Sequence, residues 1–247
     1  MGQWGQRLMA GLVAMGLHAG AAAGIEVPAG GSWQHPGQLD LAGGSLVVDG
    51  LFRLDNGQLS GLDDLDIGAV GQLWVGSGTI ALAGDWRNLG QFDAGAGQVS
   101  FVDGAASASI LGDNAFHDLS LISLTGKTWR LASGRSQTIS GLLTLHGRGA
   151  QPLLLTSSQP GQAAYVNLLP GGSQAIQDLG VTAVHATGQP LARGQSNRGG
   201  SDALGWFGLL VDTLRPIPSL SNLALVLLAG GLMLASAAAR RRGAVHP

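Results

Sequence analysis

The chain has 247 residues, of which 42 are Gly, 45% are hydrophobic, only 11% are charged and none is Cys. The missing Cys excludes a disulfide framework, thiolate metal sites and cysteine nucleophiles. Residues 24–215 carry nine basic and 15 acidic side chains, a net charge of −6, whereas a nucleic-acid-binding protein needs a basic face to neutralise phosphates. The composition therefore indicates short strands and turns, and no nucleic-acid partner.

Residues 1–23 have the three parts of a secretory signal peptide. A positive charge at Arg7 precedes the apolar run 8–17, and the segment ends in Ala21-Ala22-Ala23. This order predicts export, with cleavage after Ala23 and a mature start at Gly24 or Ile25.

Between residues 25 and 205, short apolar stretches of four or five residues alternate with polar residues and stop at Gly, Asp or Asn. Examples are Ser45-Leu46-Val47-Val48, Thr79-Ile80-Ala81-Leu82 and Leu142-Leu143-Thr144-Leu145. No apolar stripe at helical spacing continues for three turns without a Gly, so long helices are not expected. The pattern predicts an all-β domain over residues 24–207.

Two architectures fit these strands, an antiparallel sandwich and a parallel solenoid. A short apolar strand with a Gly-containing corner recurs at intervals of roughly 20 residues, at 44–48, 76–82 and 95–101, which favours the solenoid. We expect about nine coils in a rod of roughly 45 Å, from the spacing of paired strands. Trp33 and Gly205-Trp206-Phe207 are either caps of its two ends or packed surface aromatics.

Part of this region resembles secreted bacterial β-solenoid surface proteins, in which a Gly-x-Trp-x-Asn segment leads to a strand and then to a Phe-x-x-Leu-x-Leu strand. The segments that carry the resemblance here are 84–95, 99–101, 114–121, 132–141 and 201–206. The resemblance covers residues 84–207. It implies a right-handed parallel β-helix-like fold and a surface or adhesin-like role rather than a catalytic one.

Parallel β-helices also host polysaccharide lyases and hydrolases, so the acidic patch Asp63-Asp64-Leu65-Asp66 is a candidate site. In a strand, Asp64 and Asp66 would point to the same side, where they could bind Ca²⁺ or act as paired carboxylates on a glycoside. A solvated corner is the simpler interpretation, because no His, Lys or Arg lies nearby in sequence to activate a water or a sugar proton.

A second candidate group is Asp113, His117 and Asp118, in which His117 could act as a base or a metal ligand. His117 lies inside the strand phrase described above, which favours a rung side chain instead.

The remaining polar residues give no further site. His35, His146 and His185 are scattered without zinc-ligand spacing, and the chain has no Gly-x-Ser-x-Gly elbow, phosphate-binding loop or calcium-binding nonapeptide. The loop 194–202 could bind an anion, but a polar linker to the last strand explains it better. We therefore expect no metal and no cofactor.

The C-terminal part has the order of a membrane anchor. A linker with a short motif (208–219) precedes residues 220–239, which carry no charge, and Arg240-Arg241-Arg242 begin the basic tail 240–247. Twenty residues at about 1.5 Å each span about 30 Å, the thickness of a bilayer's hydrocarbon core. The sequence predicts one transmembrane helix, with the Arg cluster in the cytoplasm and the solenoid on the outer side of the cytoplasmic membrane.

The motif Ile217-Pro218-Ser219-Leu220-Ser221, followed by the apolar helix and the Arg cluster, resembles bacterial C-terminal sorting signals of the PEP-CTERM type, most closely the IPTL-CTERM variant. That motif reads roughly Ile-Pro-Thr-Leu-Ser before an aromatic position. Here Ser219 replaces Thr, and Leu223 stands where Trp is usual. The resemblance implies a Gram-negative envelope protein that an exosortase-like membrane protease recognises and cuts near the motif. A plain C-terminal membrane anchor is the alternative.

Two functions remain open from the sequence. The first is a non-enzymatic exported envelope protein, tethered or sorted by its C-terminus, with a structural, adhesive or matrix role and surface polysaccharide or matrix as partner. The second is a polysaccharide-active enzyme that uses Asp64 and Asp66, or Asp113 and His117. A passive spacer differs from the first only in having no ligand.

Overall fold

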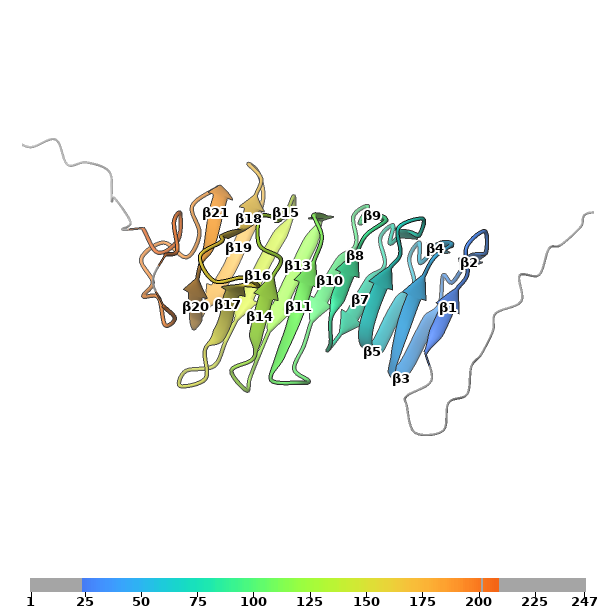
Figure 1. Ribbon diagram of the computed structural model, residues 1–247, viewed down its shortest axis with the longest axis horizontal. Coiled ribbons are helices and arrows are strands. Elements are labelled where there is room, and N and C mark those ends of the chain that lie inside the picture. The colour runs from blue at the N-terminus through green and yellow to red at the C-terminus, as the bar shows by residue number, and fades with distance from the viewer. Residues whose placement is uncertain (1–23, 201, 209–247) are drawn as a thin grey trace, which may run out of the picture. The chain divides into compact units, whose positions relative to one another are not determined.

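The computed structural model describes residues 24–200 and 202–208, and these residues form an all-β parallel solenoid (Figure 1). The expected all-β class and solenoid architecture are thus confirmed for this part of the chain. The predicted signal peptide, sorting motif, transmembrane helix and basic tail lie outside the described residues.

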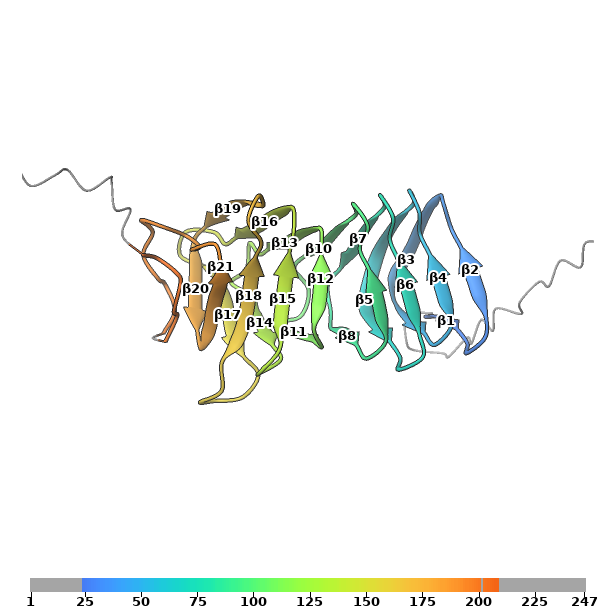
Figure 2. The ribbon, with the colours of Figure 1, turned by 90° about the horizontal axis from the view of Figure 1, so that it is seen from above.

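The strands form three faces that run along the solenoid (Figures 1 and 2). Face 1 consists of β1 (Ile25–Val27), the ends of β3 (Gln38–Val48) and β5 (Gln58–Ile67), β8 (Trp86–Asn88), β11 (Ser107–Leu111), β14 (Thr128–Leu131), β17 (Leu153–Ser157) and β20 (Leu179–Thr182). Face 2 consists of β2 (Ser32–Gln34), β4 (Leu51–Arg53), β6 (Gln72–Trp74), β9 (Gln91–Asp93), β12 (Asn114–Phe116), β15 (Ser136–Ile139), β18 (Ala164–Leu168) and β21 (Val184–Gly188). Face 3 consists of the beginnings of β3 and β5, β7 (Thr79–Leu82), β10 (Gln98–Phe101), β13 (Asp118–Ile122), β16 (Leu142–His146) and β19 (Ser173–Gln177).

One coil takes a strand from face 1, then face 2, then face 3, and each strand pairs in parallel with its equivalent in the next coil. On face 1, for example, Leu46 pairs with Leu65, and Leu65 pairs with Trp86. Every ladder between the named strands is parallel, so the sandwich alternative is wrong. The expected repeat of roughly 20 residues holds through the first four coils.

The described residues form eight coils, not the expected nine. Later coils are longer than 20 residues: Leu142 pairs with Ser173, and Leu153 pairs with Leu179. Residues 189–208 form no further coil. The eight rungs of face 1 therefore extend over about 34 Å at the spacing of paired strands, shorter than the expected 45 Å.

The core is a set of apolar side chains stacked coil upon coil. Alternate residues of each strand point inward, and on face 1 a single file of pairing partners runs along the axis: Leu46, Leu65, Trp86, Ile110 and Leu131, each at most 2% exposed. Burial of one such side chain contributes about 1.5–3 kcal/mol. The stack thus stabilises every coil through its two neighbours.

The corners change character between the fourth and fifth coils. In coils 2 to 4 the corner from face 2 to face 3 has four residues, as in 75–78 and 94–97, whereas in coil 5 it is His117 alone. The corner from face 3 to face 1 changes in the opposite sense, from residues 83–85 to residues 102–106. The first four coils and the following ones are therefore two types of coil.

Glycine allows the four-residue corners to stack directly upon one another. Gly76 and Gly95 both have positive φ, 66° and 55°, and a Cβ on Gly95 would lie 2.4 Å from the carbonyl oxygen of Gly76. Only Gly fits this left-handed, close-packed position without strain.

Face 2 is broken where the two types of coil meet. Its strands form two separate four-stranded sheets, β2-β4-β6-β9 and β12-β15-β18-β21, and β9 is not hydrogen-bonded to β12. Faces 1 and 3 continue through this junction, because β8 pairs with β11 and β10 pairs with β13.

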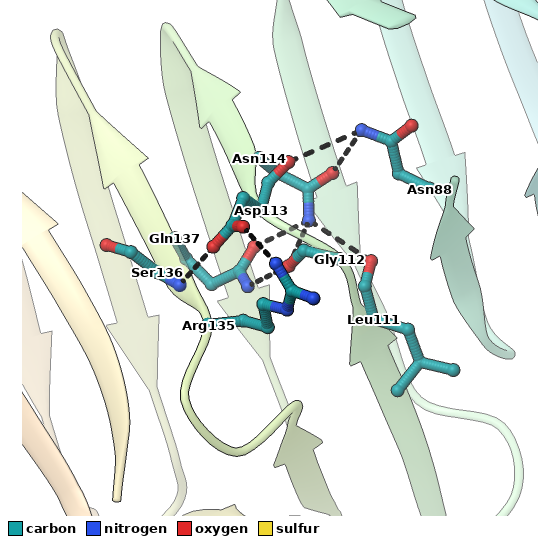
Figure 3. Close-up of polar contacts among 8 residues, drawn as sticks. All are labelled: Asn88, Leu111, Gly112, Asp113, Asn114, Arg135, Ser136 and Gln137. Carbon is teal, nitrogen blue, oxygen red and sulfur yellow. Dashed lines mark hydrogen bonds and ion pairs between the residues drawn. The ribbon is translucent and has the colours of Figure 1, made fainter. Parts of the chain in front are cut away.

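Buried side chains bridge the junction where the backbone does not (Figure 3). Trp86 Nε1 and Asn88 Nδ2 donate to Asn114 Oδ1 at 2.9 and 3.0 Å, Asn114 Nδ2 donates to Gln137 Oε1 at 2.7 Å, and Gln137 Nε2 donates to the Gly112 carbonyl at 3.0 Å. Asn88, Asn114 and Gln137 are 8%, 4% and 1% exposed. This polar ladder links coils 4, 5 and 6 inside the solenoid.

Aromatic rings fill the core around the same junction. Trp86 packs edge-on against Phe92 at 4.9 Å between ring centroids and lies 5.6 Å from Phe116, while Phe101 packs against Trp129 at 4.9 Å. Edge-to-face pairs of this kind add about 0.5–1.5 kcal/mol to their area burial. The junction is thus the most aromatic part of the core.

The segment 189–208 covers the C-terminal end of the solenoid. Trp206 is 5% exposed and forms a bridge with Leu191, and the Asn197 side chain bonds both backbone groups of Val181 on the last strand of face 1. Gln195 donates to the carbonyl of Ile176 on face 3. The segment with Trp206 is therefore a cap, and the described part of the loop 194–202 belongs to it rather than being a simple linker.

Trp33 lies in the first coil and is half-buried. Its ring packs edge-on against Phe52 of the second coil at 5.2 Å, so it covers the aromatic core at the N-terminal end.

We expect Asn114→Ala to destabilise the fold by about 2–4 kcal/mol, because it removes the acceptor of Trp86 and Asn88 and the donor to Gln137, all in buried positions. Urea unfolding followed by circular dichroism measures this loss. Asn167→Ala, on the outer side of β18, is the matched control and should change stability by less than about 0.5 kcal/mol. Equal loss in both variants would contradict the proposed role of the ladder.

Candidate functional site

The break in face 2 leaves an open cleft of about 490 Å³ on the outer surface. It runs from Trp74 in coil 3 to Leu169 in coil 7 and crosses the gap between β9 and β12. Its lining consists of Trp74, Gln91, Phe92, Asp93, Ala94, Gly95, Ala115, Phe116, His117, Thr138, Ser140 and Leu169. We call it the face-2 cleft.

The wall of the cleft on the side of coil 3 is an aromatic ring. Trp74 points outward from β6 and is 38% exposed, and the guanidinium of Arg53 in coil 2 stacks over it at 4.0 Å. The pairing of Arg53 with Trp74, and of Trp74 with Asp93, puts the ring between the Arg53 cation and the cleft. Such stacking holds the ring in one orientation.

The floor contains two phenylalanines that the break partly uncovers. Phe92 points inward from β9 yet is only half-buried, because β12 does not close over it. Its ring lies 5.3 Å from that of Phe116. Polar groups surround this apolar floor: Gln91 and Asp93 lie on one side of the gap, and Thr138 and Ser140 lie on the other.

His117 lies at the corner between β12 and β13, not within a rung as the sequence favoured. Its Nδ1 is 3.1 Å from Asp118 Oδ1, and the same carboxylate oxygen accepts the Leu142 N–H at 2.7 Å. His117 and Asp118, which the sequence placed in one candidate group, thus lie close together at one end of the cleft.

Asp113 is not part of this group. It lies at the other end of β12, at the corner between faces 1 and 2, where it accepts the Ser136 N–H at 2.8 Å and the Arg135 guanidinium at 2.9 Å (Figure 3). The hydrogen bond from Ser136 lowers the pKa of Asp113, partial burial opposes this, and Arg135 adds to it. The carboxylate therefore stays ionised and engaged, and the proposed grouping of Asp113 with His117 is wrong.

Asp64 and Asp66 flank the buried Leu65 in β5 but have separate partners. Asp64 accepts the N–H of Asp85, in the next coil, at 2.6 Å, and Asp66 lies 3.8 Å from Arg87. Arg87 is far away in sequence and adjacent only because the coils stack. Asp64 lies beside the corner 83–85 of the next coil, whereas Asp66 lies within the face-1 ladder, paired with Val47 and Arg87. The interpretation of this patch as a solvated corner therefore does not describe Asp66.

Carboxylates repeatedly connect one coil to the next. Asp85 accepts the Ser109 N–H at 2.7 Å, Asp103 accepts the Leu124 N–H at 2.8 Å, and Asp178 accepts the Gly149 N–H at 2.9 Å. Asp64, Asp113 and Asp118 do the same. Hydrogen bonds to a charged acceptor are stronger than neutral ones, so much of the acidic excess of this chain stabilises the stacking of its coils.

The only lysine of the chain is buried within the solenoid. Lys127 is 1% exposed, donates to the carbonyls of Ala83 and Val102, and lies 4.2 Å from the Trp129 ring centroid. Burial lowers its pKa, against the charges of Asp103, Asp63 and Asp85. It therefore closes the enlarged corner between faces 3 and 1, a role for which the sequence offered no signal.

Asp103 forms the outer part of the same corner. Partial burial acts to raise its pKa, but hydrogen bonds from Ser123, Leu124 and Thr125 and the charge of Lys127 outweigh this, and the pKa is lowered. The folded structure thus favours the ionised form of Asp103.

The three other histidines among the described residues lie apart from one another. His35 packs near Trp33 at 5.8 Å, His146 ends β16, and His185 Nε2 is 3.1 Å from Asp202. Within residues 24–200 and 202–208, no group of three His, Cys, Asp or Glu side chains is arranged to hold a metal ion. The same residues include no helix of the length and hydrophobicity that a membrane crossing requires.

The fold and the cleft define the class of this molecule, a three-faced parallel β-solenoid with an aromatic and polar cleft where one face is interrupted. No family model, no curated protein and no solved structure matches the chain. The function must therefore be argued from the residues of this chain alone.

We expect the melting temperature to fall as the solution is acidified, because Asp103 and Asp113 have lower pKa values in the folded chain than the unperturbed 3.8. Their contribution is complete above that value and is lost as the pH falls through the lower folded pKa. A D103N/D113N variant should show a smaller fall in melting temperature between about pH 6 and about pH 3 than the unmodified protein.

Asp66→Asn is the control for this titration, because an exposed ion pair such as Asp66 with Arg87 contributes little. A double variant with the pH dependence of the unmodified protein would show that these intercoil bonds do not stabilise the folded state.

Proposed function

We propose that this chain is a non-catalytic exported protein of a bacterial envelope, with a structural, adhesive or matrix role. The observation that carries the proposal is the engagement of its carboxylates. Catalysis of polysaccharide cleavage needs an acid and a base that face a common substrate. Asp64 and Asp113 instead accept backbone N–H groups of the adjacent coil, and Asp66 lies beside Arg87 on face 1. Nothing in these contacts favours the enzymatic alternative.

The location follows from the two ends of the sequence. Residues 1–23 direct export, residues 220–239 anchor the chain in the cytoplasmic membrane, and Arg240, Arg241 and Arg242 hold the tail in the cytoplasm. The solenoid then lies in the periplasm. Its parallel strands and stacked core suit a rigid body that stands away from a membrane.

The motif Ile217-Pro218-Ser219-Leu220-Ser221 is, in this proposal, the recognition sequence of an exosortase-like membrane protease. Cleavage near it would release the solenoid from the anchor toward the outer surface. Without cleavage the chain remains a periplasmic rod on the inner membrane.

Cysteine labelling tests the topology without background, because the chain has no Cys. In a Gram-negative host, Gln159→Cys, on an exposed loop of the solenoid, should react with a membrane-impermeant maleimide in intact spheroplasts. Ala244→Cys, in the basic tail, should react only after lysis. Labelling of Ala244→Cys but not Gln159→Cys in intact spheroplasts would refute export and the proposed orientation.

Mass spectrometry of the mature C-terminus tests the processing step. In cells that contain an exosortase-like protease we expect a new end near Ser219, and Pro218→Ala should restore an intact Pro247 because it alters the recognition motif. Ala244→Ser, outside the motif, is the control and should be cut normally. An intact Pro247 in the unmodified protein would instead establish a lasting anchor.

A further inference from the structure

The face-2 cleft differs from its surroundings on face 2 in composition. Elsewhere on this face, outward side chains follow one another at the spacing of the coils, as with Asn167 and Thr187. At the break, the half-buried Phe92 and the exposed Trp74 border one concavity together with amide, carboxylate and hydroxyl groups. Apolar rings with a few convergent polar groups are the usual lining of a ligand site.

The gap between β9 and β12 is too narrow for an added peptide strand. Cα atoms of these two strands approach within 8 Å of each other, whereas an inserted strand would need about 9.6 Å, twice the spacing of paired strands. A ligand must therefore lie across the outside of the cleft, in contact with side chains.

The charges of the lining oppose an anionic ligand. Asp93 provides a carboxylate, one oxygen of which accepts a hydrogen bond from the Gly95 N–H at 2.9 Å. His117 Nδ1 lies 3.1 Å from the Asp118 carboxylate, and Arg53 is stacked behind Trp74, outside the lining. An acidic polymer would thus meet the carboxylate of Asp93 and, beside His117, that of Asp118, whereas a neutral polymer carries no charge for these carboxylates to repel.

We propose that the face-2 cleft binds a short segment of a neutral polysaccharide, with one sugar ring stacked on Trp74 and its hydroxyl groups bonded to Gln91, Asp93, Thr138 and Ser140. This inference names the ligand of the adhesive or matrix role proposed above and rests on it. Amide and hydroxyl side chains both donate to and accept from hydroxyl groups, and an ionised carboxylate accepts from them. An aromatic ring offers an apolar platform for the C–H face of a sugar.

The dimensions of the cleft agree with an extended oligosaccharide. From Trp74 in coil 3 to Leu169 in coil 7 the lining advances by four coils, about 19 Å at the spacing of paired strands. One coil is close to the length of one β-linked pyranose, so successive sugars would meet equivalent positions of successive coils. The site therefore suits a chain of a few sugars rather than a single one.

Isothermal titration of the full-length protein in detergent with neutral cellohexaose and chitohexaose tests the inference, and an oligomer of polygalacturonate is the anionic comparison. We expect at least one neutral hexasaccharide to bind and the anionic one to fail. Trp74→Ala should weaken binding about tenfold, since it removes the stacking platform. Ala115→Glu, which places a charge on the exposed floor, should abolish it.

Tyr165→Ala is the matched control, because Tyr165 is an aromatic residue that points outward from β18 on the same face but does not line the cleft. It should bind within a factor of about two of the unmodified protein. Circular dichroism shows that each variant is folded, which separates loss of the site from loss of the structure.

Three results would overturn the inference: no binding of either neutral hexasaccharide, preference for the anionic oligomer, or binding that Trp74→Ala and Ala115→Glu leave unchanged. A bound extended peptide with no sugar binding would assign the cleft to a protein partner instead. These outcomes are independent of the cysteine-labelling experiment. A protein that is exported but binds no sugar would retain its proposed location and lose only this ligand.

Discussion

Backbone pairing between successive coils is the constraint on which the rest of the structure depends. Each strand bonds to its equivalent one coil earlier and one coil later, so a coil with altered corners must still place its strands in register. The fifth coil achieves this on two faces, where β11 and β13 continue the sheets, but not on face 2. Backbone groups left unpaired there are costly. The buried ladder through Asn114 and the rings around Trp86 offset that cost at the same place.

The class of fold could be predicted because alternation of inward and outward side chains is visible in short segments. Gln98–Phe101, with Val99 and Phe101 buried, is an example, and the coil length follows from the recurrence of such segments.

The number of coils could not be predicted, because corners such as 102–106 lengthen some coils without any change in their strands. The cleft escaped prediction for the same reason, since it arises from the number of residues in two corners and not from a motif. Lys127 follows a Thr-Gly pair that suggests a solvated turn, yet it is buried.

The residues of the Gly-x-Trp-x-Asn phrase now have a physical explanation. Trp86 and Asn88 both donate to Asn114, and Phe116, two residues later, packs against Trp86. Segments almost 30 residues apart in the chain therefore form one buried unit across the junction of two types of coil. Substitution of one residue of this unit leaves the polar groups of its partners without hydrogen bonds. These residue types are therefore expected to occur together in a solenoid with such a junction.

On an intact stretch of a solenoid face, outward side chains repeat at the coil spacing, so the surface changes little from one coil to the next. An interruption of the sheet changes this: Phe92, which would otherwise be covered, becomes half-exposed beside the outward-pointing Trp74. The walls remain rigid, since β9 and β12 each belong to a four-stranded sheet and the polar ladder holds the coils behind them. A site built on rigid elements loses little entropy when a ligand binds. The mismatch between the two types of coil thus provides a preorganised cleft. Hydrogen bonds of carboxylates and amides hold the coils together, so the aromatic and hydroxyl side chains of the cleft are not needed for that purpose and remain available for a ligand.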